Sequence, residues 1–279
     1  MGDIIFARTR YAYDSYTDYY KLVQLSGFPI CYIDEMNVAD PNNLYIVSPM
    51  NGEMLDFMSD ENKRNNHKAT LIQWNLERPS GSNGMQQYIN DNKKLLHQDY
   101  FDMIIVSDHV LAQQSGFVYV PMGSHEGLGY PGDYQDKFYD FIHLSCYSSN
   151  RSWLFKDPST PKEEIDGLKI ATNGWGEERH QRLLRSRFMV NVHQDEYMFI
   201  EPIRFSLAIS YGLPIITENC YDLYPYDKIE GIYQIGKNGI LETIKSLLDK
   251  YLELYNAGTF LRHEFTVTNT FRSYLEGYL

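Results

Sequence analysis

The chain has 279 residues, 43% of them hydrophobic and 22% charged, and carries a formal net charge of -12. This length and composition predict a globular protein with room for two compact domains, and they exclude the disordered, collagenous and membrane classes. The negative charge opposes general attraction to the phosphates of nucleic acids, although a local basic cleft could override that average.

The N-terminus and the cysteines indicate a cytoplasmic protein. Asp3 leads straight into an apolar strand without the basic region of a signal peptide, and no apolar run is long enough to cross a bilayer. Cys31, Cys146 and Cys220 show no Cys-x-x-Cys spacing, so neither a disulfide framework nor a thiolate zinc site is expected. We therefore expect reduced cysteines and no membrane insertion.

Short apolar runs alternate with helical stretches along the first half of the chain. The expected strands cover residues 3–7, 28–33, 43–48, 70–74, 103–107 and 117–120, and the first expected helix covers residues 16–26. Such alternation is typical of a mainly parallel sheet. The run 121–133 is rich in Gly and Pro and predicts a linker, so we expect an N-terminal domain over residues 1–130.

The same pattern starts again after the linker. The expected strands cover residues 138–144, 167–172, 188–193 and 213–217, and the expected helices open near residue 152 and cover residues 177–187, 202–211, 238–255 and 259–278. These elements predict a second domain over residues 131–279, whose last helix is a candidate to cross back to the first domain. The fold class is therefore α/β with two Rossmann-like domains, and ligands bind at the carboxyl ends of the strands in such sheets.

The most informative segment, residues 185–218, runs from a strand through a polar loop into a helix. Pro202 suits the first helical position, and Glu201 suits the N-cap before it. The loop and the helix start can offer backbone N–H groups to an anion, and a diphosphate fits such a site.

This segment resembles the donor-binding segment of GT-B glycosyltransferases, with AISYGLP at residues 208–214 followed by an apolar strand. The preceding strand end, Asn191-Val192-His193, is most similar to the CgeB-like (spore-maturation-type) branch. Other parts of that branch are resembled in the same order by residues 71–79, 100–123 and 140–151. One position departs from the pattern, because Leu207 stands where many GT-B enzymes have a Glu that holds the donor ribose.

The resemblance implies a GT-B arrangement, with an acceptor-side domain over residues 1–130 and a nucleotide-sugar-binding domain over residues 131–279. It also implies metal-independent transfer of a sugar from a nucleotide-diphosphate donor to an acceptor hydroxyl. The nucleotide sugar is then a co-substrate, with no tightly bound cofactor, and the acceptor is a saccharide, a small molecule or a hydroxymethylated DNA base. Two alternatives stay open: a non-catalytic nucleotide- or sugar-binding module of the same fold, which Leu207 motivates, and a sugar-nucleotide epimerase. The sequence has no His-Glu-x-x-His, P-loop or Gly-x-Gly-x-x-Gly pattern, which argues against a zincin, a P-loop NTPase and a dinucleotide dehydrogenase.

The predicted donor-binding residues surround the same helix start. Arg204 lies one turn after Glu201, so it could meet the diphosphate while Glu201 takes sugar or ribose hydroxyls, unless the two form only an exposed ion pair. Arg151 suits a phosphate role or is a solvated loop arginine, and His193 is either a ligand of an oxygen or a structural histidine. The full set is Ser145, Asn150, Arg151, Asn173, Trp175, Gly176, His193, Gln194, Glu201 and Arg204.

Trp175 belongs to a turn with Asn173 and Gly176 after an expected strand. Glycine lets the backbone approach a ligand and Trp175 could stack on a nucleobase, or the turn merely opens a helix around a packed Trp.

Three further residues are candidates for catalysis. Glu77 is a candidate base, and its alternative is an ion pair that stabilises a turn. Asp14 lies in the loop after the first strand or caps a helix. His125 contacts the donor sugar or only its own turn.

Overall fold

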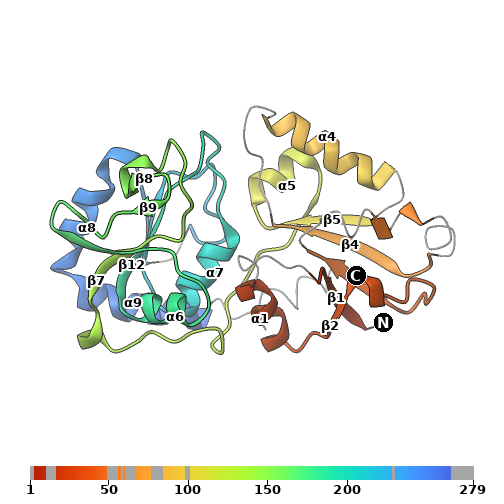
Figure 1. The fold of residues 1–279 in the computed structure, drawn as a ribbon, viewed down its shortest axis with the longest axis horizontal. Coiled ribbons are helices and arrows are strands. Elements are labelled where there is room, and N and C mark those ends of the chain that lie inside the picture. The colour runs from red at the N-terminus through yellow and green to blue at the C-terminus, as the bar shows by residue number, and fades with distance from the viewer. Residues whose placement is uncertain are drawn as a thin grey trace. The chain divides into compact units, whose positions relative to one another are not determined.

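The computed structural model describes residues 3–10, 17–48, 56–57, 59–60, 67–76, 84–97, 101–227 and 230–264. The chain forms two compact units, Met1–Pro121 and Met122–Leu279, hereafter unit 1 and unit 2. Each unit has its own six-stranded sheet with helices beside it (Figure 1). The expected α/β class, with two Rossmann-like and mainly parallel sheets, is confirmed.

Unit 1 contains a sheet of strand order β2-β1-β3-β4-β5-β6, and every described strand pair in it is parallel. Its strands are β1 (Ile4–Arg8), β2 (Ile30–Tyr32), β3 (Leu44–Val47), β4 (Thr70–Asn75), β5 (Met103–Val106) and β6 (Val118–Tyr119), and its helices include α1 (Thr17–Leu25), α4 (Gly84–His97) and α5 (His109–Ser115). Buried aromatic rings join strand to helix, since Tyr19 of α1 meets Trp74 of β4 edge-on at 5.5 Å. All six expected strands are present: four are shorter than expected, β1 is shifted by one residue, and β4 extends one residue further.

Unit 2 contains a sheet of order β10-β11-β7-β12-β13-β14, parallel except for the edge strand β10. Its strands are β7 (Tyr139–Ile142), β10 (Glu164–Ile165), β11 (Leu168–Ala171), β12 (Ser186–Asn191), β13 (Ile215–Glu218) and β14 (Ile232–Ile235), and its helices are α6 (Glu177–Leu184), α7 (Pro202–Ser210), α8 (Ile240–Leu248) and α9 (Tyr251–Glu264). Phe141, Phe188 and Ile216 of three neighbouring strands pack with Ile244 of α8 in the core. This apolar centre fixes where the strands end and their polar loops begin.

Three expectations for unit 2 are wrong in detail. The helix expected near residue 152 is a short 3-10 turn, Ser152–Leu154, followed by the small antiparallel pair β8 (Phe155–Asp157) and β9 (Thr160–Pro161), because Asp157 accepts the Ser159 N–H and stabilises a turn instead. The helix expected to reach residue 187 ends at Leu184, since Ser186 already pairs with Tyr139 in the sheet.

The third concerns the C-terminal helices. The helix expected over residues 238–255 is two helices, α8 and α9, and the strand β14 before them was not foreseen. The expected helix over residues 259–278 overlaps α9 as far as Glu264, and its crossing to the first domain falls outside the described residues. Within the described ranges, none of the helices combines the length and the apolar character that a bilayer crossing needs.

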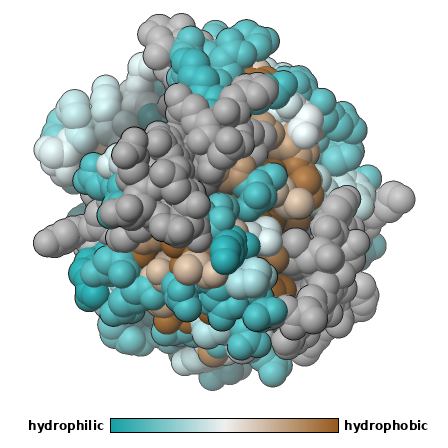
Figure 2. All heavy atoms as spheres, turned by 90° about the vertical axis from the view of Figure 1, so that its right-hand side faces the viewer, coloured by the Kyte–Doolittle hydropathy of each residue, from teal (hydrophilic) through white to brown (hydrophobic). Residues whose placement is uncertain are grey.

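On one face of the molecule, the described residues form a surface that is ordinary for a folded protein. Figure 2 shows mostly hydrophilic side chains there, with smaller apolar areas between them. Scattered apolar surface of this kind is normal for folded proteins. It therefore indicates no binding patch by itself.

Candidate functional site

The strand order of unit 2 marks one position at which a ligand is expected. Strand β11 pairs with β7 along one edge, and β12, which comes later in the chain, pairs with β7 along its other edge. In open parallel sheets, ligands bind at such a reversal, outside the carboxyl ends of the two central strands. Here the loop after β7, residues 143–150, and the loop after β12, residues 192–201, come together at that edge.

Three charged side chains form a network at this position. Arg151 Nη2 donates to Glu201 Oε1 at 2.9 Å, and Arg204 Nη1 forms an ion pair with Glu201 Oε2. The exposed fractions of the side chains are 2% for Arg151, 11% for Glu201 and 16% for Arg204. The alternative of an exposed ion pair is therefore wrong, and so is the alternative of a solvated Arg151.

Arg151 ties the two loops to the helix start. Its Nε donates to Val192 O at 2.8 Å, and its Nη1 lies 3.5 Å from Cys146 O. Together with the bond to Glu201, these contacts join the loop after β7, the end of β12 and the first turn of α7. Breaking such a buried network is costly, because a charge is left without its partner.

Glu201 is the N-cap residue of α7 and Pro202 is its first helical residue, as the sequence predicts. The Glu201 side chain makes no capping hydrogen bond, since its carboxylate is bound by the two guanidinium groups instead. Arg204 Nη1 also donates to Asn191 Oδ1, at 3.0 Å, at the end of β12. The helix start, with its partial positive charge, thus lies beside two cations.

Buried polar atoms without partners lie in the loop after β7. Among the described residues, both ring nitrogens of His143 and the hydroxyls of Ser145 and Ser148 find no hydrogen-bond partner. His143 is fully buried, and desolvation, reinforced by the charges of Arg204 and Arg151, lowers its pKa to about 3. Its imidazole is therefore neutral at physiological pH. Buried polar atoms are nearly always satisfied, so these unpartnered atoms mark the loop after β7 as a candidate for binding a polar ligand or water.

His193 is anchored to the neighbouring strand. Its backbone N–H donates to Glu218 Oε2 at 2.6 Å, and its Nε2 lies 3.1 Å from Asn219 O, which requires a proton on that nitrogen. Burial raises the pKa of the Glu218 carboxyl, although the His193 N–H bond opposes the shift. These contacts favour the structural alternative for His193.

Known proteins resemble this chain in structure but not in sequence. No protein-family model matches the sequence, and no curated protein matches it. The structure is similar to the crystal structure of HepE (Alr3699) of Anabaena in complex with UDP-glucose, with a TM-score of 0.64, 10% identity, and coverage of 100% of this chain and 99% of that chain. The chain has the GT-B fold. A crystal structure of an α1,3-fucosyltransferase also matches, with a TM-score of 0.44, 10% identity, and coverage of 99% of this chain and 89% of that one.

Other predicted donor residues of this GT-B fold lie at the rim of the same loops. Asn150 Nδ2 donates to His193 O at 3.0 Å, and its Oδ1 accepts a bond from the exposed Lys237. Ser145 is buried and Gln194 is exposed. The sequence analysis did not identify Lys237 or His143. His143 could have been found, because it is a polar residue directly after a central strand.

The turn after β11 holds Trp175 at the surface. Trp175 is 43% exposed, so the alternative of a packed Trp is wrong, and the Arg179 guanidinium lies 4.3 Å from its ring centre. Arg179 also donates to Gly174 O at 2.8 Å and to Asn173 Oδ1 at 3.2 Å, which fixes the turn. Gly176 opens α6 with φ of 55°, a conformation that favours glycine.

Of the three catalytic candidates, one, His125, belongs to the described residues. Asp14 and Glu77 lie outside the described residues. His125 Nδ1 accepts the Gly127 N–H at 2.9 Å, so its ring stabilises its own turn. In the described part of the chain, no group of three His, Cys, Asp or Glu side chains is arranged to hold a metal ion.

Proposed function

We propose that the protein is a glycosyltransferase that moves a sugar from a nucleotide-diphosphate donor to an acceptor hydroxyl. The donor binds at the carboxyl ends of β7 and β12 in unit 2, and no tightly bound cofactor is needed. The observation that carries the proposal is the buried network of Arg151, Glu201 and Arg204 beside unpartnered polar atoms of the loop after β7. The GT-B fold agrees with this function, although a fold alone does not specify chemistry.

The charge of the network suits a diphosphate. Two guanidinium groups and the nearby Lys237 outnumber the carboxylate of Glu201 in a chain whose net charge is -12. The α7 start adds the partial positive charge of its dipole, which favours an anion at that end. As the sugar–phosphate bond breaks, negative charge grows on the leaving diphosphate, and fixed cations stabilise it.

The residues of the site take different roles in this proposal. Arg204, which is partly exposed, reaches the diphosphate, whereas the fully buried Arg151 acts as a positioning residue for both loops. Glu201 orients the two arginines and is not the base. His143 offers a neutral donor and acceptor to the ligand if the loop after β7 opens, and Trp175 offers a flat surface to the nucleobase.

The acceptor binds at the equivalent reversal of unit 1, between β1 and β3. Thr9 and Ser48 directly follow β1 and β3, and Gln73 lies within the neighbouring β4; all three are at most 3% exposed. Thr9 Oγ1, Ser48 Oγ and Gln73 Oε1 find no partner among the described residues. Uncharged hydrogen-bonding groups suit a saccharide or a small alcohol better than the phosphates around a DNA base. Asp14 and Glu77 remain the proposed candidates for the base.

A non-catalytic module of the same fold is the second candidate, and one observation favours it. Leu207, at the position where many GT-B enzymes carry the ribose-binding Glu, is 2% exposed and packs within the core. It offers no hydrogen bond to a ribose. We place the protein near the CgeB-like branch on the sequence motifs alone, and that placement belongs to the proposal.

The test is incubation of the protein with UDP- and GDP-sugars, with and without oligosaccharide and small-alcohol acceptors. We expect thermal stabilisation by at least one nucleotide and release of the nucleoside diphosphate. Arg204→Ala should strongly reduce both, whereas Arg187→Ala, which removes a guanidinium paired with Asp140 at the other end of the strands, should keep both. Binding without release identifies the module, and no stabilisation by any nucleotide contradicts the proposal.

A further inference from the structure

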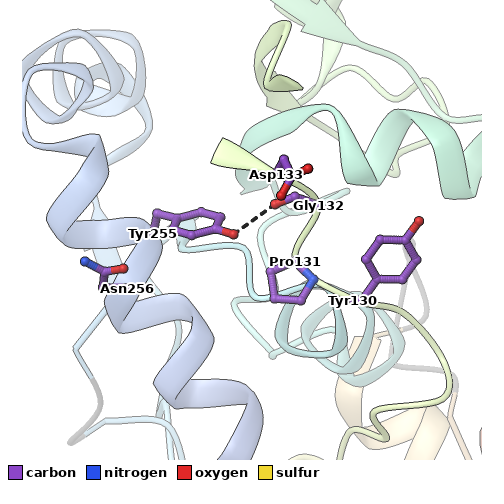
Figure 3. Close-up of a pocket in the computed structure, with 6 residues that line it drawn as sticks. All are labelled: Tyr130, Pro131, Gly132, Asp133, Tyr255 and Asn256. Atoms are coloured by element: carbon purple, nitrogen blue, oxygen red, sulfur yellow. Dashed lines mark hydrogen bonds between the residues drawn. The ribbon is translucent and has the colours of Figure 1, made fainter. Parts of the chain in front are cut away.

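Unit 2 carries a pocket at the opposite ends of its strands from the candidate donor site. The pocket has a volume of about 460 Å³ and is lined by Tyr130, Pro131, Gly132, Asp133, Tyr255 and Asn256 (Figure 3). Residues 130–133 precede β7, so they lie at its amino end, while the donor loops follow the carboxyl ends. Its volume falls in the range of about 300–1,000 Å³ that is usual for small-molecule sites.

The two tyrosine rings of the pocket are held in place. Tyr255 reaches from α9 toward the 130–133 segment and donates to Gly132 O at 2.9 Å, with Pro131 between it and Tyr130 in Figure 3. The Tyr130 ring is 53% exposed and rests edge-on against His180, with 5.7 Å between ring centres. Both rings therefore present fixed surfaces without a large ordering cost on binding.

The wall between the rings is equally rigid. A Cβ on Gly132 would lie 2.6 Å from Leu184 O, so this residue is pressed against the end of α6. Pro131 is packed against Gly212, and Arg262 Nη2 donates to Gly129 O at 2.8 Å. The 130–133 segment is therefore preorganised for ligand binding.

The chemistry of the lining selects among ligand classes. The six lining residues include one carboxylate, that of Asp133, and no cation. The nearby Lys137 is buried and donates to Leu184 O instead. Phosphate-bearing ligands are therefore disfavoured, because each phosphate needs a cation or a cluster of N–H donors.

We propose that this pocket binds a neutral saccharide, as a site separate from the donor site. The C–H face of a sugar ring matches the exposed ring of Tyr130 and the half-buried ring of Tyr255, and Asp133 and Asn256 supply a carboxylate and an amide for its hydroxyls. The proposal does not depend on the proposed transferase activity. If both hold, the pocket retains a saccharide chain while the reaction takes place elsewhere on the protein.

The test is titration of the whole chain with maltohexaose, cellohexaose and chitohexaose by calorimetry and saturation-transfer NMR. We expect at least one of them to bind, and Tyr130→Ala to weaken that binding by about tenfold. Asp133→Asn should weaken it to a smaller extent. Tyr221→Ala is the matched control, because Tyr221 is 47% exposed but does not line the pocket, and it should bind like the wild type.

Two readouts separate this site from the donor site. Circular dichroism and the thermal shift caused by UDP-glucose should be the same for Tyr130→Ala and the wild type, whatever that shift is. Binding of all three oligosaccharides below detection, equal binding by Tyr130→Ala, or binding of hexalysine in their place would overturn the saccharide assignment.

Discussion

The two units place different side chains at the same kind of reversal in strand order. In unit 1, β2 and β3 lie on opposite sides of β1, and in unit 2, β11 and β12 lie on opposite sides of β7, a position at which open parallel sheets commonly bind ligands. At this position unit 2 has buried charges that satisfy one another, whereas unit 1 has the buried, uncharged Thr9, Ser48 and Gln73. Under the proposed function, the topology determines where each ligand binds, and the side chains near the strand ends determine which ligand it is.

The largest expected effect is on the stability of unit 2. Arg151→Ala removes a guanidinium that holds Val192 O, Cys146 O and Glu201, and we expect it to lower the free energy of unfolding by about 3 kcal/mol. Urea unfolding followed by Trp fluorescence and circular dichroism measures this. Arg187→Ala breaks a more exposed pair with Asp140 and should cost about 1 kcal/mol. Equal costs for the two variants would show that the Arg151 network is no special feature.

The next effect is on nucleotide affinity, and it separates the two units. Arg204→Ala should weaken the binding of UDP or GDP by about 30-fold, because a charge-assisted hydrogen bond to a phosphate is lost. Ser48→Ala in unit 1 should leave this affinity unchanged. Calorimetric titration of both variants gives the answer, and a loss of nucleotide binding in Ser48→Ala would refute the division of roles.

A pH effect follows from the neutral His143. An unfolded histidine takes up a proton near pH 6.5, but folded His143 does so only near its pKa of about 3, so its contribution to stability falls as the pH drops through this window. The slope is about 1.4 kcal/mol per pH unit. The raised pKa of Glu218 acts in the opposite direction, since a protonated carboxyl is favoured in the folded state.

His143→Gln isolates this contribution. The ordinary pKa of histidine sets the pH range for the test, from about 6.5 to about 5. Over this range the wild type should lose about 2 kcal/mol more stability than the variant. Urea unfolding at the two pH values measures the difference. Parallel losses in the two proteins would show that His143 takes up its proton in the folded state at ordinary pH.

The sequence predicts the backbone of the site better than its interior. Glu201 and Pro202 were identifiable because cap and first-turn residues have strong local preferences. The burial of Arg151 was not, because its partners Val192 and Glu201 lie far along the chain and meet it only through the sheet register. Thr9, Ser48 and Gln73 were missed for a similar reason: each is an ordinary polar residue in the sequence, and its burial depends on the packing of neighbouring strands.

The smallest effect provides the sharpest contrast between the units. Thr9→Val keeps the shape of a buried side chain whose hydroxyl has no partner among the described residues, so the free energy of unfolding should stay the same or rise by about 1 kcal/mol. Under the proposed function, the same change should raise the KM for the acceptor about fivefold and leave that for the nucleotide sugar unchanged. A hydroxyl kept for a ligand is a cost to the free protein, whereas the charges of unit 2 stabilise the fold that carries them. Urea unfolding and steady-state kinetics of Thr9→Val test both halves, and a destabilised variant with unaltered acceptor KM would mean that Thr9 serves the fold alone.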